Sequence, residues 1–398
     1  MIEVVGKYNT AKVFTDTLEE KTYAQLLDLC NQEFVSGSTI RIMPDTHVGM
    51  GCTIGTTMTI TEKVVPGHVG VDIGCGVYVA KLTDREIDFA KLDKIIRQNV
   101  PAGFSVRQKV HHLVSDSRVS QLRCLSAIKN TDRIALSLGS LGGGNHFIEV
   151  AVDESNNHYL LIHTGSRNLG KQIADYYQKL ALDTINSNND IRVETILQLK
   201  AEGKEQEIEA SLAALKIIKV SKDMAYLEGQ NLEDYLHDME IAQEFADLNR
   251  QAIASVIFRG MNWDVVYSFI TTHNYIEPRS NILRKGAVSA YKGQQLVIPI
   301  NMRDGSILAE GKGNADWNYS APHGAGRLMS RSQAKRELTM DEYRSTMDGI
   351  FTTSVDESTL DEAPMAYKPM QQILDAIGDT VEILHIVKPV YNFKSGGE

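Results

Sequence analysis

The chain has few cysteines, and none in a paired arrangement. Only four occur in 398 residues, and no two of them form a Cys-x-x-Cys pair. This scarcity excludes a disulfide-stapled secreted scaffold and is typical of a protein from a reducing cytoplasm. We interpret Cys30, Cys52 and Cys124 as inert core residues, whereas the neighbours of Cys75 indicate chemistry.

Proline and long apolar runs are also scarce. Nine prolines and no Ser/Gly-rich linker indicate one large domain rather than several domains joined by linkers. No apolar run is long enough to span a bilayer, and the N-terminus lacks the basic-then-apolar pattern of a signal peptide. We therefore expect a cytoplasmic protein that does not associate with a membrane.

The balance of charge is acidic but uneven. The formal net charge is -10, which argues against nonspecific binding to nucleic acid. Acidic residues crowd the stretch Glu194–Asp247, whereas basic residues recur beside the motifs described below. A local cationic cleft on an acidic protein can still bind polyphosphate or RNA ends. The acidic stretch is either a solvated face or a surface for a partner protein.

The pattern of apolar residues predicts a mixed α/β (α+β) protein. We expect a single large domain over residues 1–398, with a β-rich core and a helical insertion. Leu, Ile and Ala at three- and four-residue spacing predict an acidic helical subregion over about 170–260. Strands are expected at 39–43, 52–60, 77–82, 147–152, 159–163, 265–271, 295–299 and 382–387, and further helices at 84–99, 327–335 and 370–377.

One segment places a carboxylate and a thiol three residues apart. Asp72 and Cys75 lie in the sequence VGVDIGCG. Because glycine flanks Cys75 on both sides, we expect a strand that runs into a tight turn and leaves the thiol exposed. A thiolate prefers Zn, Mn or Fe to Mg or Ca, and it can bridge two ions. The alternative is a buried cysteine beside a turn aspartate.

Three histidines flank expected strands. His146 follows a Gly-rich turn and precedes one strand, His163 ends another, and His273 follows a third. For any one of them a core histidine is the simpler explanation, but three at strand ends, together with Asp72 and Cys75, favour a metal site. The Gly-rich turn before His146 lacks the residues of a Walker loop and the spacing of a dinucleotide-binding motif.

Arginines accompany these histidines. Arg167 is four residues after His163, where its guanidinium can bind the oxygens of a metal-bound phosphate. Arg327 and Arg331 follow His323, and their spacing predicts one face of a helix with His323 near its N-terminus. Such a helix end would bind phosphate, and the imidazole could then attack phosphorus as a nucleophile.

Together the motifs resemble those of the RtcB family, the GTP-dependent RNA-splicing and repair ligases. The resemblance spans nearly the whole chain and follows the order of motifs in the family. The matching stretches are MPDTHVG (Met43–Gly49), GVDIGCG (Gly70–Gly76), GGGNHFIE (Gly142–Glu149), HTGSRNLG (His163–Gly170), HNYIE (His273–Glu277), RKGAVSA (Arg284–Ala290), HGAGRLMSR (His323–Arg331) and DEAPMAYK (Asp361–Lys368).

The resemblance implies a role for each matching residue. His323 would carry GMP on a ring nitrogen, Asn145 would lie against the phosphates, and Asp45 would lie behind the groups that touch metal or substrate. Two Mn ions, with Cys75 shared between them, would be held by Asp72, Cys75, His146, His163 and His273. Phosphates would be bound by Arg167, Arg327 and Arg331, and guanine or the GMP phosphate by Glu149, Tyr367 and Lys394.

The implied activity is that of an RNA ligase that uses GTP and Mn. His323 would attack the α-phosphate of GTP, and a 2′,3′-cyclic phosphate RNA end would be opened to a 3′-phosphate. GMP would move to that phosphate, and a 5′-hydroxyl RNA end would then displace it. The implied partners are therefore RNA ends and GTP, whereas the sequence leaves open the oligomeric state and any activating protein partner.

The chain departs from the family pattern in two places, the loop Pro299–Gly305 and a short tail after Lys394. Many members carry Pro-Gly-Ser-Met-Gly in that loop, which is expected near the nucleotide, so the difference bears on guanine preference rather than on the metal site. Two other functions use the same residues. One is a dinuclear-metal phosphoesterase for RNA cyclic phosphates without nucleotidyl transfer, and the other is a non-catalytic protein that binds RNA ends.

Overall fold

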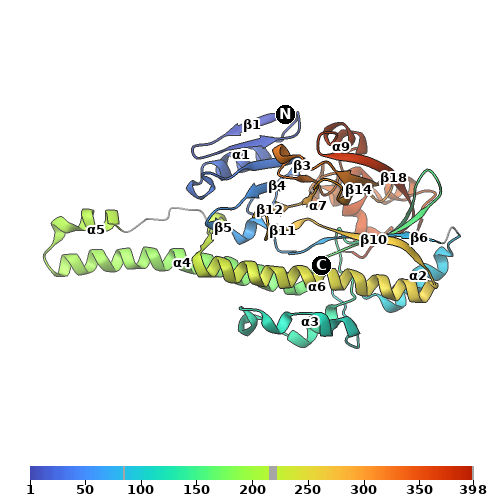
Figure 1. Cartoon of the computed structure of the whole chain (residues 1–398), viewed down its shortest axis with the longest axis horizontal. Coiled ribbons are helices and arrows are strands. Elements are labelled where there is room, and N and C mark those ends of the chain that lie inside the picture. Colours follow the sequence, from blue (N-terminus) through green and yellow to red (C-terminus); the bar gives the residue numbers. More distant parts are fainter. Residues whose placement is uncertain (84–85, 215–221, 397–398) are drawn as a thin grey trace.

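A computed structural model of the chain describes residues 1–83, 86–214 and 222–396 and confirms the mixed α/β class. Two large sheets form the body (Figure 1). The long helices α4 (Arg167–Ala201) and α6 (Gly229–Met261) pack along one side of the strands. The far end of α4 extends beyond the strands together with α5 (Ile208–Ala214). No helix in the described ranges is both long and apolar enough to cross a membrane.

The first sheet is built mainly from the N-terminal part of the chain. Its strands β2 and β3 pair in parallel, and the other neighbours are antiparallel. Its apolar face packs with α1 (Glu20–Cys30), α4 and α6 in one core cluster. The strand order is β1 (Ile2–Val5), β2 (Thr10–Val13), β3 (Ile40–His47), β4 (Ile54–Thr59), β12 (Ile282–Lys285), β11 (Asn274–Glu277).

The second sheet curls round, because β10 and β14, at the two ends of its strand order, contact each other. Neighbouring residues point to opposite faces of a strand. Tyr78 accordingly packs with α2 (Phe89–Asn99) and α6, whereas Val79 packs inside the curl with Leu308. The strand order is β10 (Val265–Thr272), β6 (Gly76–Leu82), β8 (His158–Thr164), β7 (Phe147–Val152), β18 (Val381–Phe393), β15 (Gly305–Gly311), β14 (Gln295–Asn301), and β17 (Phe351–Thr352) pairs with β18.

Short elements complete the fold. Helix α2 begins where the Asp88 side chain accepts a hydrogen bond from the Lys91 amide, as expected of an N-cap. The two-stranded pairs are β13 (Ala287–Ser289) with β16 (Ser320–Pro322) and β5 (Lys63–Val64) with β9 (Leu227–Glu228). The remaining α-helices of the described residues are α3 (Thr131–Ser137), α7 (Arg331–Glu337), α8 (Met340–Thr346) and α9 (Met370–Ala376).

Strand register brings the Cys and His motifs together where the central strands of the second sheet begin and end. Gly76 at the start of β6 pairs with Thr164 at the end of β8 and with Thr272 at the end of β10. Phe147 at the start of β7 pairs with His163. Neighbouring antiparallel strands alternate starts and ends along one edge, so residues just outside β6, β7 and β10 meet those at the end of β8.

Most expected elements are present, and three differ from expectation. The C-terminal strand extends to Phe393 rather than ending at residue 387, because it pairs in turn with β15, β7 and β17. Cys75 precedes a strand instead of following one, and its side chain is 2% exposed, so the expectation of an exposed thiol was wrong. Residues 84–85 and 215–221, within two expected helical ranges, lie outside the described part of the chain.

The helix expected over 327–335 is also displaced. It begins at Arg331, where the Ser330 side chain caps it, and Arg327 instead forms an isolated β-bridge with Tyr367. His323 follows β16 directly, so it does not lie at a helix N-terminus. The glycines at 324 and 326 explain the difference, because Gly326 has a φ of 76° and the backbone of Asp45 leaves no room there for a side chain.

Candidate functional site

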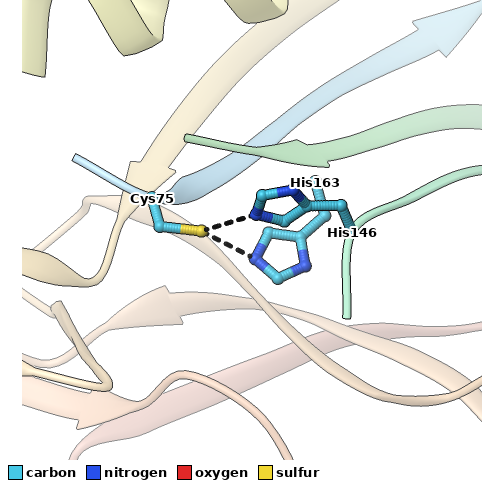
Figure 2. A group of neighbouring side chains, drawn as sticks. All are labelled: Cys75, His146 and His163. Atoms are coloured by element: carbon cyan, nitrogen blue, oxygen red, sulfur yellow. Dashed lines mark hydrogen bonds between the residues drawn. The ribbon is translucent and has the colours of Figure 1, made fainter. Parts of the chain in front are cut away.

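A buried thiol contacts two imidazoles at the strand ends of the second sheet. Cys75 Sγ is 3.2 Å from His163 Nε2 and 3.5 Å from His146 Nε2 (Figure 2). His146 Nε2 is in turn 3.1 Å from Asp72 Oδ2, and His163 Nε2 is 3.4 Å from His273 Nε2. The five residues expected to bind metal are therefore brought together, with Cys75 in the middle.

These separations fit ligands of a metal ion. Donor atoms of Cys75, His146 and His163 all lie within 4.8 Å of one another. Thiolate and imidazole ligands of one tetrahedral ion lie about 3.4–3.6 Å apart when bond lengths are ordinary. The observed distances of 3.2–3.5 Å lie close to this range, and a thiolate with imidazoles suits Zn or Fe better than Mg or Ca.

Hydrogen bonding and burial keep the imidazoles available as ligands. His163 Nδ1 is 3.1 Å from the carbonyl oxygen of Asn145. A carbonyl oxygen only accepts hydrogen bonds, so Nδ1 carries the hydrogen and Nε2 carries the lone pair. Burial lowers the pKa of His163 and of His273 well below the usual 6.5, so both rings are neutral at pH 7. Neutral rings are the form that binds a metal ion.

The pKa of the Cys75 thiol is shifted in the opposite direction, upwards. Burial and the charge of Asp72 raise the pKa of Cys75 well above the usual 9, so the group is a thiol at neutral pH until a cation replaces its proton. Arg167 lies near this side of the cluster. Its guanidinium donates to Ser140 Oγ and to the Gly103 carbonyl, and a Cβ on Gly142 would overlap it.

Metal binding is therefore expected to release about one proton, taken from Cys75. Between pH 6.5 and 9, His163 and His273 are already neutral and the Cys75 thiol is still protonated, so the affinity for Mn or Zn should rise about tenfold per pH unit. Calorimetric titration in buffers of different ionisation enthalpy measures the released protons. An affinity that does not change over this range would contradict the assignment of Cys75 as a ligand.

His323 lies beside the cluster and is held by a buried carboxylate. Its ring centroid is 4.9 Å from that of His273, and its Nδ1 is 2.7 Å from Asp45 Oδ2. Asp45 is fully buried, and the Lys368 ammonium donates to the carbonyls on either side of it, those of Pro44 and Thr46. With Nδ1 occupied, Nε2 is the ring nitrogen free to react.

A cavity of about 340 Å³ joins these groups to a cationic wall. His323, Cys75 and His273 contribute to one part of its lining, and the loop Pro299–Gly305, expected near a nucleotide, contributes to another. The other expected residues that line the cavity are Asp72, Asn145, Glu149, His163, Arg327, Arg331, Tyr367 and Lys394. Three expected residues do not line the cavity: His146 belongs to the cluster, Asp45 lies behind His323, and Arg167 lies with His146 against Gly142.

The cationic wall is organised round Glu362, which the sequence did not single out. Its carboxylate is 3.3 Å from Arg327, 3.2 Å from Arg331 and 3.0 Å from Lys394, and Tyr367 donates to it at 2.6 Å. Although burial opposes ionisation, these cations hold the pKa of Glu362 down to about 2. The sequence signal that could have identified Glu362 was its place in the DEAPMAYK motif (Asp361–Lys368), one residue after Asp361.

A second buried carboxyl of the cavity behaves differently. Burial raises the pKa of Glu149 to about 8, against the effects of Asn392 and Lys394. Asn392 donates to its Oε2 at 2.9 Å, whereas Oε1 is buried without a hydrogen-bond partner in the described residues. The carboxyl therefore keeps its proton at pH 7, and Oε1 is suited to a ligand whose N–H groups stabilise the carboxylate form in place of that proton.

The fold and this cluster define a mixed α/β protein whose Cys/His site can hold a metal ion at the floor of a cationic cavity. A family model described as "tRNA-splicing ligase RtcB" matches residues 25–395, so the chain belongs to the RtcB family. It is 30% identical to "RNA-splicing ligase RtcB" of Escherichia coli K12, over 94% of each chain. It is also 28% identical to "tRNA-splicing ligase RtcB" of Aeropyrum pernix, over 90% of this chain and 89% of that one.

Proposed function

We propose that the protein is an RNA ligase that joins a 3′-phosphate or 2′,3′-cyclic phosphate end to a 5′-hydroxyl end through a guanylyl-histidine on His323. The observation that carries this proposal is the contact chain from Asp72 through Cys75 and His273 to His323, whose Nδ1 is fixed by Asp45 at 2.7 Å. A nucleophile oriented by a buried carboxylate next to a metal-type cluster suits phosphoryl chemistry. Family membership supports the same activity.

Asp45 and His323 would carry the first chemical step. The carboxylate accepts a hydrogen bond from Nδ1–H, which leaves the Nε2 lone pair directed at phosphorus. Nε2 forms a bond to the α-phosphorus of GTP, the bond from that phosphorus to the bridging oxygen breaks, and pyrophosphate leaves. Asp45 stabilises the positive charge that develops on the ring.

Two Mn ions would be held by Cys75 together with two pairs of donors, since Cys75 Sγ contacts one member of each pair. Asp72 and His146 form one pair, and His163 and His273 form the other. Such ions would neutralise charge on the phosphate oxygens. The cations on Glu362 would hold the remaining phosphate charge, since Arg331 is 48% exposed and still free to reach a ligand.

Glu149 supports guanine as the base. Guanine presents N–H donors along its Watson–Crick edge, and these donors would favour the carboxylate form of Glu149, whose Oε1 has no protein partner among the described residues. Lys394 and Tyr367 line the same cavity, where they would contact the nucleotide. Asn145 lies between the Gly-rich turn and His146, where its side chain would contact the phosphates.

The test is to incubate the protein with Mn and α-labelled GTP, denature it, and measure the label that remains on the chain. We expect label from α-labelled but not from γ-labelled GTP. Addition of RNAs with a cyclic phosphate end and a 5′-hydroxyl end should discharge the label and give a joined strand.

A protein with bound metal that takes no label would contradict nucleotidyl transfer. If such a protein opened cyclic phosphate ends without GTP, it would be a metal-dependent phosphoesterase. The metal content should therefore be measured on the same sample.

A further inference from the structure

A second cavity adjoins the site and is unusually polar. It encloses about 850 Å³ and lies between the start of the 101–109 loop, the 353–358 segment and the C-terminal residues 393–396. Lys394 lines both cavities, so the second one opens beside the Glu362 cluster of the first. A ligand that reaches the active site from this side would pass Lys394.

Arg107 and Lys109 line this cavity, and neither has a carboxylate partner among the described residues. Within the described residues, the side chain of Arg107 forms one hydrogen bond, from Nη1 to the Asn99 carbonyl at 3.2 Å. The Nε atom of Arg107 is buried and has no partner there. Burial also lowers the pKa of this guanidinium, which shows that it is desolvated without a counter-charge. Lys109 is exposed and forms no ion pair in the described residues.

Of the other charged residues of the cavity, two cations are already paired, and one carboxylate, Asp356, has no cationic partner in the described residues. Arg97 is paired with Asp93 at 2.9 Å, and Lys394 with Glu362 at 3.0 Å. The Asp356 carboxylate accepts from the amide and hydroxyl of Ser358. In the described lining the two unpaired cations, Arg107 and Lys109, outnumber the unpaired carboxylate of Asp356, so the net charge is positive, and neutral donors such as Ser105 and Gln108 line the space around them.

We propose that this second cavity binds the phosphodiester backbone of an RNA strand whose end reaches the Cys/His cluster past Lys394. Backbone phosphates are the anions that match a polar, cationic cavity with spaced guanidinium and ammonium groups. The chain is acidic overall, with a formal net charge of -10, so a local cationic path is needed to bring a polyanion to the site. The proposal rests on the proposed function only in taking the strand to be RNA.

The test is direct binding of short single-stranded RNAs, one with a 5′-hydroxyl end and one with a 3′-phosphate end, followed by fluorescence anisotropy over a range of salt concentrations. We expect Arg107→Gln and Lys109→Gln each to weaken binding of at least one strand about tenfold, the effect of losing one charged hydrogen bond. Each should also lower the slope of log Kd against log salt by about 0.7, the value for one phosphate contact on a single strand.

Lys200→Gln is the matched control, because Lys200 is exposed near the far end of α4. It should change neither affinity nor slope. Lys109 is exposed as well, so its substitution tests the cavity even if Arg107→Gln unfolds, which thermal melting would reveal. The strand that loses affinity identifies which RNA end uses the cavity. Unchanged affinity and slope for both strands in a folded Lys109→Gln and Arg107→Gln double variant would overturn the proposal.

Binding is measured without GTP, so the outcome is independent of nucleotidyl transfer. If the wild type takes no label from GTP while the variants still lose RNA affinity, the cavity assignment stands and the ligase assignment falls. If labelling succeeds and RNA affinity is unaffected, the opposite holds.

Discussion

His323→Ala is expected to take no label from α-labelled GTP and to join no RNA ends. Loss of the nucleophile removes the covalent route entirely, and losses of roughly 10⁶-fold in rate are of the order seen when a covalent catalyst lacks its nucleophile. The variant should still bind metal, because His323 contacts the cluster only through the ring of His273. Label that persists on the His323→Ala chain would place the nucleophile elsewhere.

Asp45→Asn is expected to slow the labelling of His323 without abolishing it. The amide can no longer accept the Nδ1 proton as a carboxylate does, and it cannot stabilise a positive ring, so the labelling rate should fall about 10²–10⁴-fold. A positioning role predicts that the final extent of labelling is retained after long incubation. A role in folding alone predicts instead a lower melting temperature with unchanged labelling per folded molecule.

Cys75→Ala is expected to lose both metal and ligation. Cys75 lies between the two imidazoles nearest to it, so its removal should weaken metal binding by more than the roughly 10–100-fold loss caused by removing a residue that only orients a ligand. Metal analysis after dialysis and the labelling assay measure the two effects on one sample. Oxidation of the thiol should have the same consequence.

Cys30→Ala is the matched control for this prediction. Cys30 is also a fully buried thiol, but it belongs to α1 and packs in the core cluster of the first sheet. It should lose some stability, in the range of about 1–2 kcal/mol for a small buried group, with metal content and labelling unchanged. A Cys75→Ala protein with full activity, or one indistinguishable from Cys30→Ala, would refute the metal-site assignment.

The arrangement also explains why the arginines behave differently from one another. Arg327 is bound to Glu362 and to the Asp361 carbonyl, and its side chain is only 15% exposed. It is therefore held in place as part of the cationic wall. Arg331 shares the Glu362 carboxylate and also pairs with that of Asp361, but it is half-exposed, so it can turn to a phosphate at small cost. The two residues are four apart in sequence, yet their difference follows from the break between the β-bridge at Arg327 and helix α7.

The sequence by itself determined most of the elements and predicted the residues of the metal site. Short apolar runs rich in β-branched residues define β6, β7 and β8, and the motifs at their ends carry Cys75, His146 and His163. These features are local, since an apolar run and a glycine turn are properties of a few consecutive residues. The resemblance to a family then assigned roles to residues whose spacing alone left several functions open.

Only the tertiary structure decided which groups meet. Asp45 and His323 are 278 residues apart, Arg327 and Glu362 are 35 apart, and Arg107 lies in a cavity completed by residues 353–358 and the C-terminal segment. It also decided that Cys75 is buried and precedes its strand, and that His323 follows a strand rather than opening a helix. Such features depend on how strands pair and sheets curl, and strand pairing is set by contacts between distant segments that no local pattern encodes.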